Sequence, residues 1–314
     1  MSEPVARTRA PAALRGLRDA WVVARFDLGE SLRSRKVLIF LALYAAGSVA
    51  AAVIFTEVLQ DIEEALAEQL LVARTSQPGS LTQAVMEAPE LRLVLVRLVR
   101  DEALADALLQ IPPIALLYHW VALTFAPVFV VFTSSDAISG EVSSGSVRYA
   151  LFRTDRMSWA VGKLLGQMCL TAVGLALGAF GAWVVGYVQL ASFAPLDTAT
   201  WLSRYVLTAF FFAFAHLGLA LGVSQLTRSV PWSRALGLFA LVFVFGAHGW
   251  LGRDAVREEA PVWSESLQQI FPAAHRLELW RPALSDGAIS LVMLAALGIL
   301  YFALGHLRFA RRDA

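Results

Sequence analysis

Six apolar stretches, each long enough to cross a lipid bilayer as a helix, decide what this chain can fold into. They cover residues 37–55, 113–133, 164–187, 205–226, 235–252 and 288–307. Each lies near the roughly 20 residues that a hydrocarbon core about 30 Å thick requires. In addition, 58% of the residues are hydrophobic and only 16% are charged, against about 25% in ordinary soluble domains. The chain is therefore predicted to be an all-α polytopic membrane protein with six transmembrane helices.

The charge distribution sets the expected orientation of these spans. With the N-terminus inside, the cytoplasmic segments hold about 17 of the 26 basic residues but only about 8 of the 25 acidic ones. The net charge of the whole chain is only +1, although its basic residues concentrate on the cytoplasmic side and its acidic residues on the opposite side. Six spans return residues 308–314 to the cytoplasm, where their three arginines obey the same rule. A cleaved signal peptide is disfavoured, because about 36 residues precede the first apolar stretch, and a retained signal anchor is expected.

The energy source is expected to lie outside this chain. The spans contain no central Asp, Glu, Lys or Arg, the residues that usually form proton relays and ion pathways. Only His119 and His216 sit well inside a span. A phosphate-binding loop is also missing, since Gly162 and Lys163 are followed by Leu164 rather than by Ser or Thr. Neither an ion gradient nor bound ATP is therefore predicted to act directly on this subunit.

The sequence gives little support to an enzymatic function or to a metal site. A His-Glu-x-x-His motif is absent, and no nucleophile is paired with a base. The single Cys169 rules out an internal disulfide and a Cys-rich metal site. A copper path through Met168, Cys169 and the histidines is the alternative, but five Met and one Cys are few and scattered. We predict no catalytic residue, no metal site and no cofactor on this chain.

The N-terminal residues 1–36 are predicted to contain an amphipathic helix. Its apolar residues recur at steps of three and four and comprise Leu14, Leu17, Trp21, Ala24, Leu28 and Leu32. Charged residues, among them Asp27 and Arg33, are expected on its other side. Such a helix lies in the membrane interface, either as a docking element for a partner or as a simple anchor.

The cytoplasmic segment 134–163 separates the second and third spans. We expect a short helix capped by Ser135, lying across the membrane face. A turn at Thr154 and Asp155 should then lead into the third span near Lys163. An ordinary basic loop that merely obeys the positive-inside rule is the alternative.

The residues of this segment follow a recognisable order: Glu141, Gly145, Leu151, Arg156, Gly162 and Lys163. That order resembles the pattern of type-2 ABC transporter permeases, a family that includes relatives involved in multi-copper enzyme maturation. In this chain Ser146 and Val147 replace the usual Thr-Leu, and the usual Pro before the Arg is absent. The resemblance also covers the N-terminal helix, the six spans and the two cytoplasmic termini, and so extends over nearly the whole chain.

The resemblance implies a coupling role for the cytoplasmic residues. In that family the segment after the second span holds a coupling helix that fits a cleft in a cytosolic ATPase, and a connecting helix before the first span touches the same ATPase. The residues expected to couple to the ATPase are Glu141, Gly145, Arg156, Lys163, Trp21 and Arg33. ATP and Mg²⁺ would then be bound by the ATPase rather than by this chain.

Two segments are expected outside the membrane on the opposite side. Residues 56–112 carry two helical stripes separated by a turn at 76–80, which predicts a helical hairpin. Its acidic residues form either a merely solvated face or part of a lid or a platform for an extracytoplasmic partner. Residues 253–286 contain Trp263, Phe271 and Trp280, which suit the lipid interface. In the resembled family this second segment is re-entrant. Glycines spaced by four on the third and fourth spans predict close helix packing, within one subunit or at a dimer seam.

These observations predict the permease subunit of an ABC exporter in a bacterial plasma membrane. Its partners would be a cytosolic ABC ATPase, membrane lipid, a second copy or a similar permease, and an extracytoplasmic protein in some systems, but no nucleic acid. Candidate residues for the translocation path are His119, His216 and Phe243. Two alternatives stay open: a permease-like subunit that performs mechanical or assembly work on an extracytoplasmic protein, and an ATP-independent scaffold or receptor.

Overall fold

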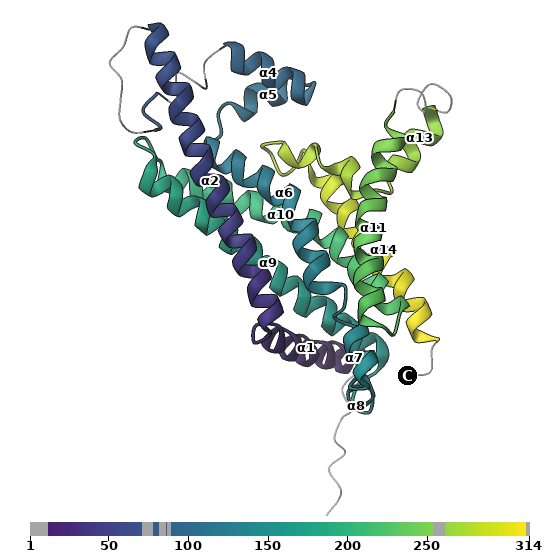
Figure 1. The fold of residues 1–314 in the computed structure, drawn as a ribbon. Coiled ribbons are helices and arrows are strands. Elements are labelled where there is room, and N and C mark those ends of the chain that lie inside the picture. The colour runs from purple at the N-terminus through teal and green to yellow at the C-terminus, as the bar shows by residue number, and fades with distance from the viewer. Residues whose placement is uncertain (1–11, 71–77, 82–85, 87–88, 254–260, 312–314) are drawn as a thin grey trace, which may run out of the picture.

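The computed structural model describes residues 12–70, 78–81, 86, 89–253 and 261–311. Within these residues every regular element is a helix, and six helices are long and apolar enough to cross a membrane. They are α2 (Arg35–Leu70), α6 (Pro113–Ser134), α9 (Arg156–Gln189), α10 (Pro195–Leu226), α11 (Val230–Leu251) and α14 (Ala288–Ala310). The predicted all-α, six-span fold is therefore confirmed (Figure 1).

Parts of the predicted segments lie outside the described residues. They are residues 1–11 of the N-terminus, residues 71–77, 82–85 and 87–88 of the hairpin, residues 254–260 of the re-entrant segment, and residues 312–314 of the C-terminal tail. The side chain of Leu14 in the predicted stripe is also outside the described set.

The starts of the spans follow from local sequence. Prolines stand in the first turns of α6, α10 and α11, where a missing backbone N–H costs nothing and the proline φ angle already suits a helix. Helix α9 begins differently, because the Asp155 carboxylate accepts the backbone N–H of Ser158 at 2.8 Å as an N-cap. The hydrogen bond from the Ser158 hydroxyl also holds the pKa of Asp155 below its usual range.

The short helices gather at the two ends of the bundle. Helix α1 (Ala12–Ser31) lies across one end, beside α7 (Ser139–Ser144) and α8 (Val147–Leu151), and the described C-terminus reaches the same end (Figure 1). We call this the α1/α7 end. The opposite end carries α4 (Pro89–Val99), α5 (Glu102–Leu108) and α13 (Pro261–Gln268). The two ends of the described chain thus lie on one side, as an even number of spans requires.

Helices α10 and α14 approach so closely that their backbones touch. A Cβ atom built on Gly218 would lie 1.9 Å from the Gly298 carbonyl oxygen, and one built on Gly222 would lie 2.4 Å from that of Tyr301. On α9, a Cβ on Gly162 would lie 2.7 Å from the Ala20 carbonyl oxygen of α1. Packing within one subunit therefore explains these small residues, because only glycine leaves room for backbone against backbone.

The segment 134–163 differs in detail from its prediction. Ser135 is the C-cap of α6 and not the start of the short helix, which begins at Ser139 as α7. Helix α9 begins at Arg156, about two turns before Lys163, because Asp155 provides its N-cap. Lys163 therefore lies inside the third span and not at its entrance.

At the opposite end, the first span continues far beyond the apolar stretch. Helix α2 has 36 residues and is about 54 Å long, so the first arm of the predicted hairpin is part of the same helix as the span. Helix α4 packs on α5. The turn at 78–81 is held by the buried Glu63 carboxylate, which accepts the backbone N–H of Gly79 at 2.9 Å. In residues 261–286, the 3₁₀ helices η1 (Pro272–His275) and η2 (Glu278–Trp280) pack against α14.

The backbone contact between α10 and α14 predicts a strong effect of a single methyl group. Gly218→Ala should lower the free energy of unfolding by about 1–3 kcal/mol, because the opposing carbonyl is backbone and cannot rotate away. Thermal unfolding of the purified protein in detergent measures the change. Gly246→Ala on α11 is the matched control, since a Cβ there meets nothing within 4 Å. Equal melting temperatures for the two variants would contradict the close approach.

Candidate coupling site

A buried lysine joins three helices at the α1/α7 end. Lys163 of α9 is 4% exposed, and its Nζ lies 2.6 Å from Asp27 Oδ1 of α1. The same ammonium pairs with the carboxylate of Glu141 on α7. One cation therefore neutralises carboxylates from the two short helices, and the low local dielectric strengthens both interactions.

The amide of Gln167, one turn after Lys163, extends this cluster to a fourth helix. Its Nε2 donates to Asp27 Oδ2 at 2.9 Å, while its Oε1 accepts the hydroxyl of Ser134 from α6 at 2.9 Å. Both sides of the amide are thus used, which fixes its orientation. We call Asp27, Glu141, Lys163, Gln167 and Ser134 the buried cluster.

Three members of the buried cluster were not predicted as site residues, and Asp27 was placed on the wrong side of α1. Asp27 is 4% exposed, because it lies three residues after Ala24 and seven after Ala20, on the face that packs against α9. A stripe of small residues that includes one carboxylate was the available signal. Gln167 follows Lys163 by four residues on the same helix face, which was the second signal.

The N-terminal end of α7 is held by α10, α2 and α11. Ser224 Oγ of α10 accepts the backbone N–H groups of Ile138 and Ser139 at 3.1 and 3.0 Å. Just before them, the Asp136 carboxylate pairs with Lys36 of α2 at 2.6 Å and with Arg234 of α11 at 2.5 Å. Two backbone donors at the start of α7 are thereby satisfied, and α7 is attached on both sides.

Gly145 ends α7 in a conformation that other residues adopt with difficulty. Its φ angle is +76°, in the left-handed region, and its N–H bonds to the Val142 carbonyl at 3.3 Å. A Cβ at this position would meet nothing within 4 Å. The glycine is therefore required by backbone conformation and not by lack of space.

Arg156 contacts the last helix. Its Nη1 donates to the carbonyl oxygens of Ala310 at 2.7 Å and Phe309 at 3.4 Å, at the C-terminal end of α14. A guanidinium at this place satisfies carbonyls that have no intrahelical partner and opposes the negative end of the helix dipole. Arg156 thus ties the start of α9 to the end of α14.

Trp21 and Arg33 are exposed near α1. The Trp21 side chain is 56% exposed and Leu17 is 66% exposed, so these members of the predicted stripe face outward, whereas Ala24 faces α9. Arg33 lies exposed in the turn between α1 and α2. Unlike Lys163, both residues are available to a lipid surface or a partner.

The three path candidates are placed in different surroundings. His119 is fully buried, with its ring 4.0 Å from that of Tyr205 and 4.7 Å from that of Trp280. His216 is also fully buried, and its Nδ1 lies 2.8 Å from the Phe212 carbonyl oxygen. Phe243 is 57% exposed on α11. The two imidazoles lie inside the bundle, and only Phe243 lies on its surface.

The described residues contain no group of three or more His, Cys, Asp or Glu side chains that could hold a metal ion. Cys169 lies exposed on α9. The acidic side chains of the buried cluster are instead satisfied by an ammonium and an amide.

The buried cluster predicts a large effect of removing its one cation. Lys163→Met should lower the free energy of unfolding by about 3–5 kcal/mol, because two carboxylates would remain desolvated without their partner. Lys36→Met is the matched control, expected to cost about 1 kcal/mol or less, since Lys36 is partly exposed and Asp136 keeps Arg234. Thermal or denaturant unfolding of both variants in detergent provides the comparison. Similar losses of unfolding free energy would contradict the prediction that the buried Lys163 stabilises the fold more than the partly exposed Lys36.

A comparison with protein families gives a match. The family described as "ABC-2 family transporter protein" matches residues 21–314, nearly the whole chain. A search of curated proteins found no match. The chain belongs to the ABC-2 transporter family as its multi-pass membrane subunit, and this membership implies a partner ATPase.

Proposed function

We propose that this chain is the permease of an ABC exporter, acting as a homodimer with two cytosolic ATPases in a bacterial plasma membrane. The α1/α7 end faces the cytoplasm and receives the ATPases, which bind ATP and Mg²⁺. Substrate passes between the two copies by alternating access. The direction of transport rests on the resemblance to type-2 permeases, and the orientation rests on the positive charge of the cytoplasmic segments.

The observation that carries this proposal is the attachment of α7 on both sides. Glu141 joins it to α9 and, through Lys163, to α1. Ser224 joins its first turn to α10, and Asp136 joins the preceding turn to α2 and α11. A displacement of α7 by an ATPase therefore has a direct side-chain route to five other helices, which is what a coupling helix requires.

The surface next to α7 supports ATPase docking at this end. On and just after α8, Tyr149 and Phe152 are 77% and 86% exposed, and Trp21 of α1 is 56% exposed. Large exposed aromatic side chains are enriched in the centres of protein interfaces. Glu141 and Lys163 then act as positioning residues behind this surface, and Arg156 passes the displacement on to α14.

For the translocation path, the exposed face of α11 is the candidate. Phe243 and Phe239 stack there with ring centroids 6.2 Å apart, and both are more than half exposed. His216 packs behind this face, with its ring 5.5 Å from that of Phe245 on α11, whereas His119 packs against Tyr205 of α10 and Trp280 of η2. An apolar path of this kind suits lipids, drugs and peptides alike.

A second candidate function is mechanical or assembly work on an extracytoplasmic protein. It is favoured by the extension of α2 beyond the span, by the pair α4 and α5, and by the turn that Glu63 holds against α2. Together these elements offer a platform for a protein partner. Retention of this partner on the purified complex, lost when residues 89–108 are deleted, would favour assembly work over export.

The proposed coupling route predicts a specific defect. Glu141→Gln keeps the shape of the side chain but removes the charge that pairs with Lys163. In proteoliposomes with the cognate ATPase, the stimulation of ATP hydrolysis by the permease should fall about tenfold, as expected for the loss of a charge-assisted hydrogen bond. Co-purification of the ATPase should stay unchanged, because the docking surface remains.

Ser143→Ala on the same helix is the matched control, since its exposed hydroxyl donates to the Gly140 carbonyl within α7. It should preserve both association and stimulation. Full stimulation of ATP hydrolysis by the Glu141→Gln variant would show that the buried cluster takes no part in coupling. Loss of association would make Glu141 a docking residue instead.

The proposed orientation is tested by accessibility of single cysteines. In a Cys169→Ala background, Ser144→Cys at the α1/α7 end should be protected from a membrane-impermeant thiol reagent in intact cells, whereas Ser266→Cys on α13 should react. Both native serines are exposed, so burial in the protein does not confound the comparison. Lysed cells provide the control in which both must react. The reversed pattern in intact cells would contradict the proposed orientation.

A further inference from the structure

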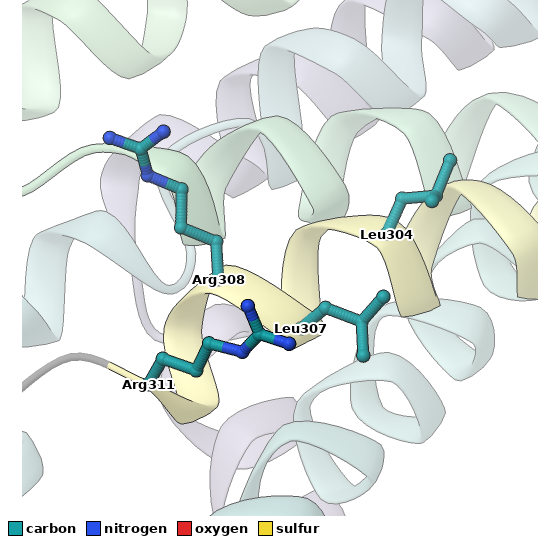
Figure 2. A pocket seen from close by; sticks show the side chains of 4 residues that line it. All are labelled: Leu304, Leu307, Arg308 and Arg311. Carbon is teal, nitrogen blue, oxygen red and sulfur yellow. The ribbon is translucent and has the colours of Figure 1, made fainter.

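A pocket lies on α14 near its C-terminal end, outside the buried cluster. Its volume is about 430 Å³, and it is lined by Leu304, Leu307, Arg308 and Arg311. Figure 2 shows the four side chains on one helix, with Arg311 running back along the helix toward Leu307. The pocket therefore combines an apolar part and a cationic part.

The pocket lies at the end of the stripe of α14 that faces away from the bundle. The exposed side chains of this stripe are Ile289, Met293, Leu300, Leu304 and Leu307, at steps of three, four and seven residues. Arg311 follows Leu307 by four residues and so continues the same face. An exposed apolar stripe on a membrane span contacts lipid tails, and the side chains at its end lie at the level of lipid headgroups.

Within residues 12–311, as far as the structure describes them, no carboxylate pairs with the two arginines of the pocket. Neither Arg308 nor Arg311 makes an ion pair or hydrogen bond with another side chain among the described residues. Lys163 and Arg234, by contrast, are paired with carboxylates. The carbonyls at the end of α14 are already occupied by Arg156, so they do not account for these two guanidinium groups.

We propose that this pocket binds the headgroup of an anionic phospholipid. The phosphate lies between the guanidinium groups of Arg308 and Arg311, which suit bidentate contacts to phosphate oxygens. The acyl chains lie along Leu304 and Leu307 and continue down the lipid-facing stripe. A site with both features selects an anionic lipid over a zwitterionic lipid and over a free anion.

The experiment compares lipids on the purified chain in detergent by native mass spectrometry. Short-chain phosphatidylglycerol is titrated against phosphatidylcholine with the same acyl chains. The wild type should retain phosphatidylglycerol preferentially, and the double variant Arg308→Gln with Arg311→Gln should bind it about tenfold more weakly, since two attractive charges are lost. Replacement of both arginines by lysine should keep most of the preference.

The control variant is Arg148→Gln with Arg153→Gln, which removes the same charge from exposed positions at the same end of the bundle. It should bind phosphatidylglycerol like the wild type. Equal binding of both lipids, or unchanged binding by the Arg308 and Arg311 variant, would overturn the proposal. Displacement of the lipid by an equal concentration of inorganic phosphate would reveal a simple anion site and reject the lipid. Loss of a second copy or of the ATPase from the double variant, with lipid binding unchanged, would make the pocket a protein contact.

Discussion

The ammonium group of Lys163 has to be neutralised where it lies, because the residue is 4% exposed and an unpaired buried charge costs several kcal/mol. Among the residues that the structure describes, Asp27 and Glu141 supply the carboxylates there, one from α1 and one from α7. The positions of these two helices on α9 are thus coupled through a single side chain. Glycine at position 162 allows the α1 backbone to come close enough for the pair to form, since a Cβ there would collide with the Ala20 carbonyl. Close packing and charge neutralisation therefore depend on each other at this end of the bundle.

The second property of the α1/α7 end is that its contacts are polar and directional. Ser224 and Asp136 hold the start of α7, Glu141 holds its middle, and Gly145 closes it with a left-handed residue. Hydrogen bonds and ion pairs of this type require defined distances and angles, so they change between discrete arrangements. A helix attached in this way moves its neighbours as a unit or breaks a defined bond. This distinguishes α7 from an ordinary loop between two spans.

The sequence predicts the spans well because apolar length is a strong signal, and hydrocarbon leaves the backbone few alternatives to the helix. Through their order in the chain it also selects Glu141, Gly145 and Lys163; the structure pairs Glu141 with Lys163, and the coupling role of these residues stays a prediction. The role of Asp27 could not be predicted from amphipathicity, since a carboxylate on a helix is normally solvated and its partner lies 136 residues away. The cap at Asp155 was mistaken for part of a turn, which placed the start of α9 too late. The burial of His119 and His216 likewise depends on aromatic rings from other helices, and the local sequence around each histidine does not predict these contacts.

The separation between Asp27 and Lys163 has a consequence for biogenesis. During translation Asp27 is synthesised 136 residues before its cation, so α1 cannot take its final position while the first spans are being inserted. In that interval the unpaired carboxylate is solvated by water. Helix α1 therefore stays at the surface of the bilayer until its cation is available. The partner carbonyls of Arg156 are made later still, at the last helix. The end of the bundle where coupling is proposed is therefore completed only after the final span has been inserted, and a chain that stops early lacks this end while its first spans are already in the membrane.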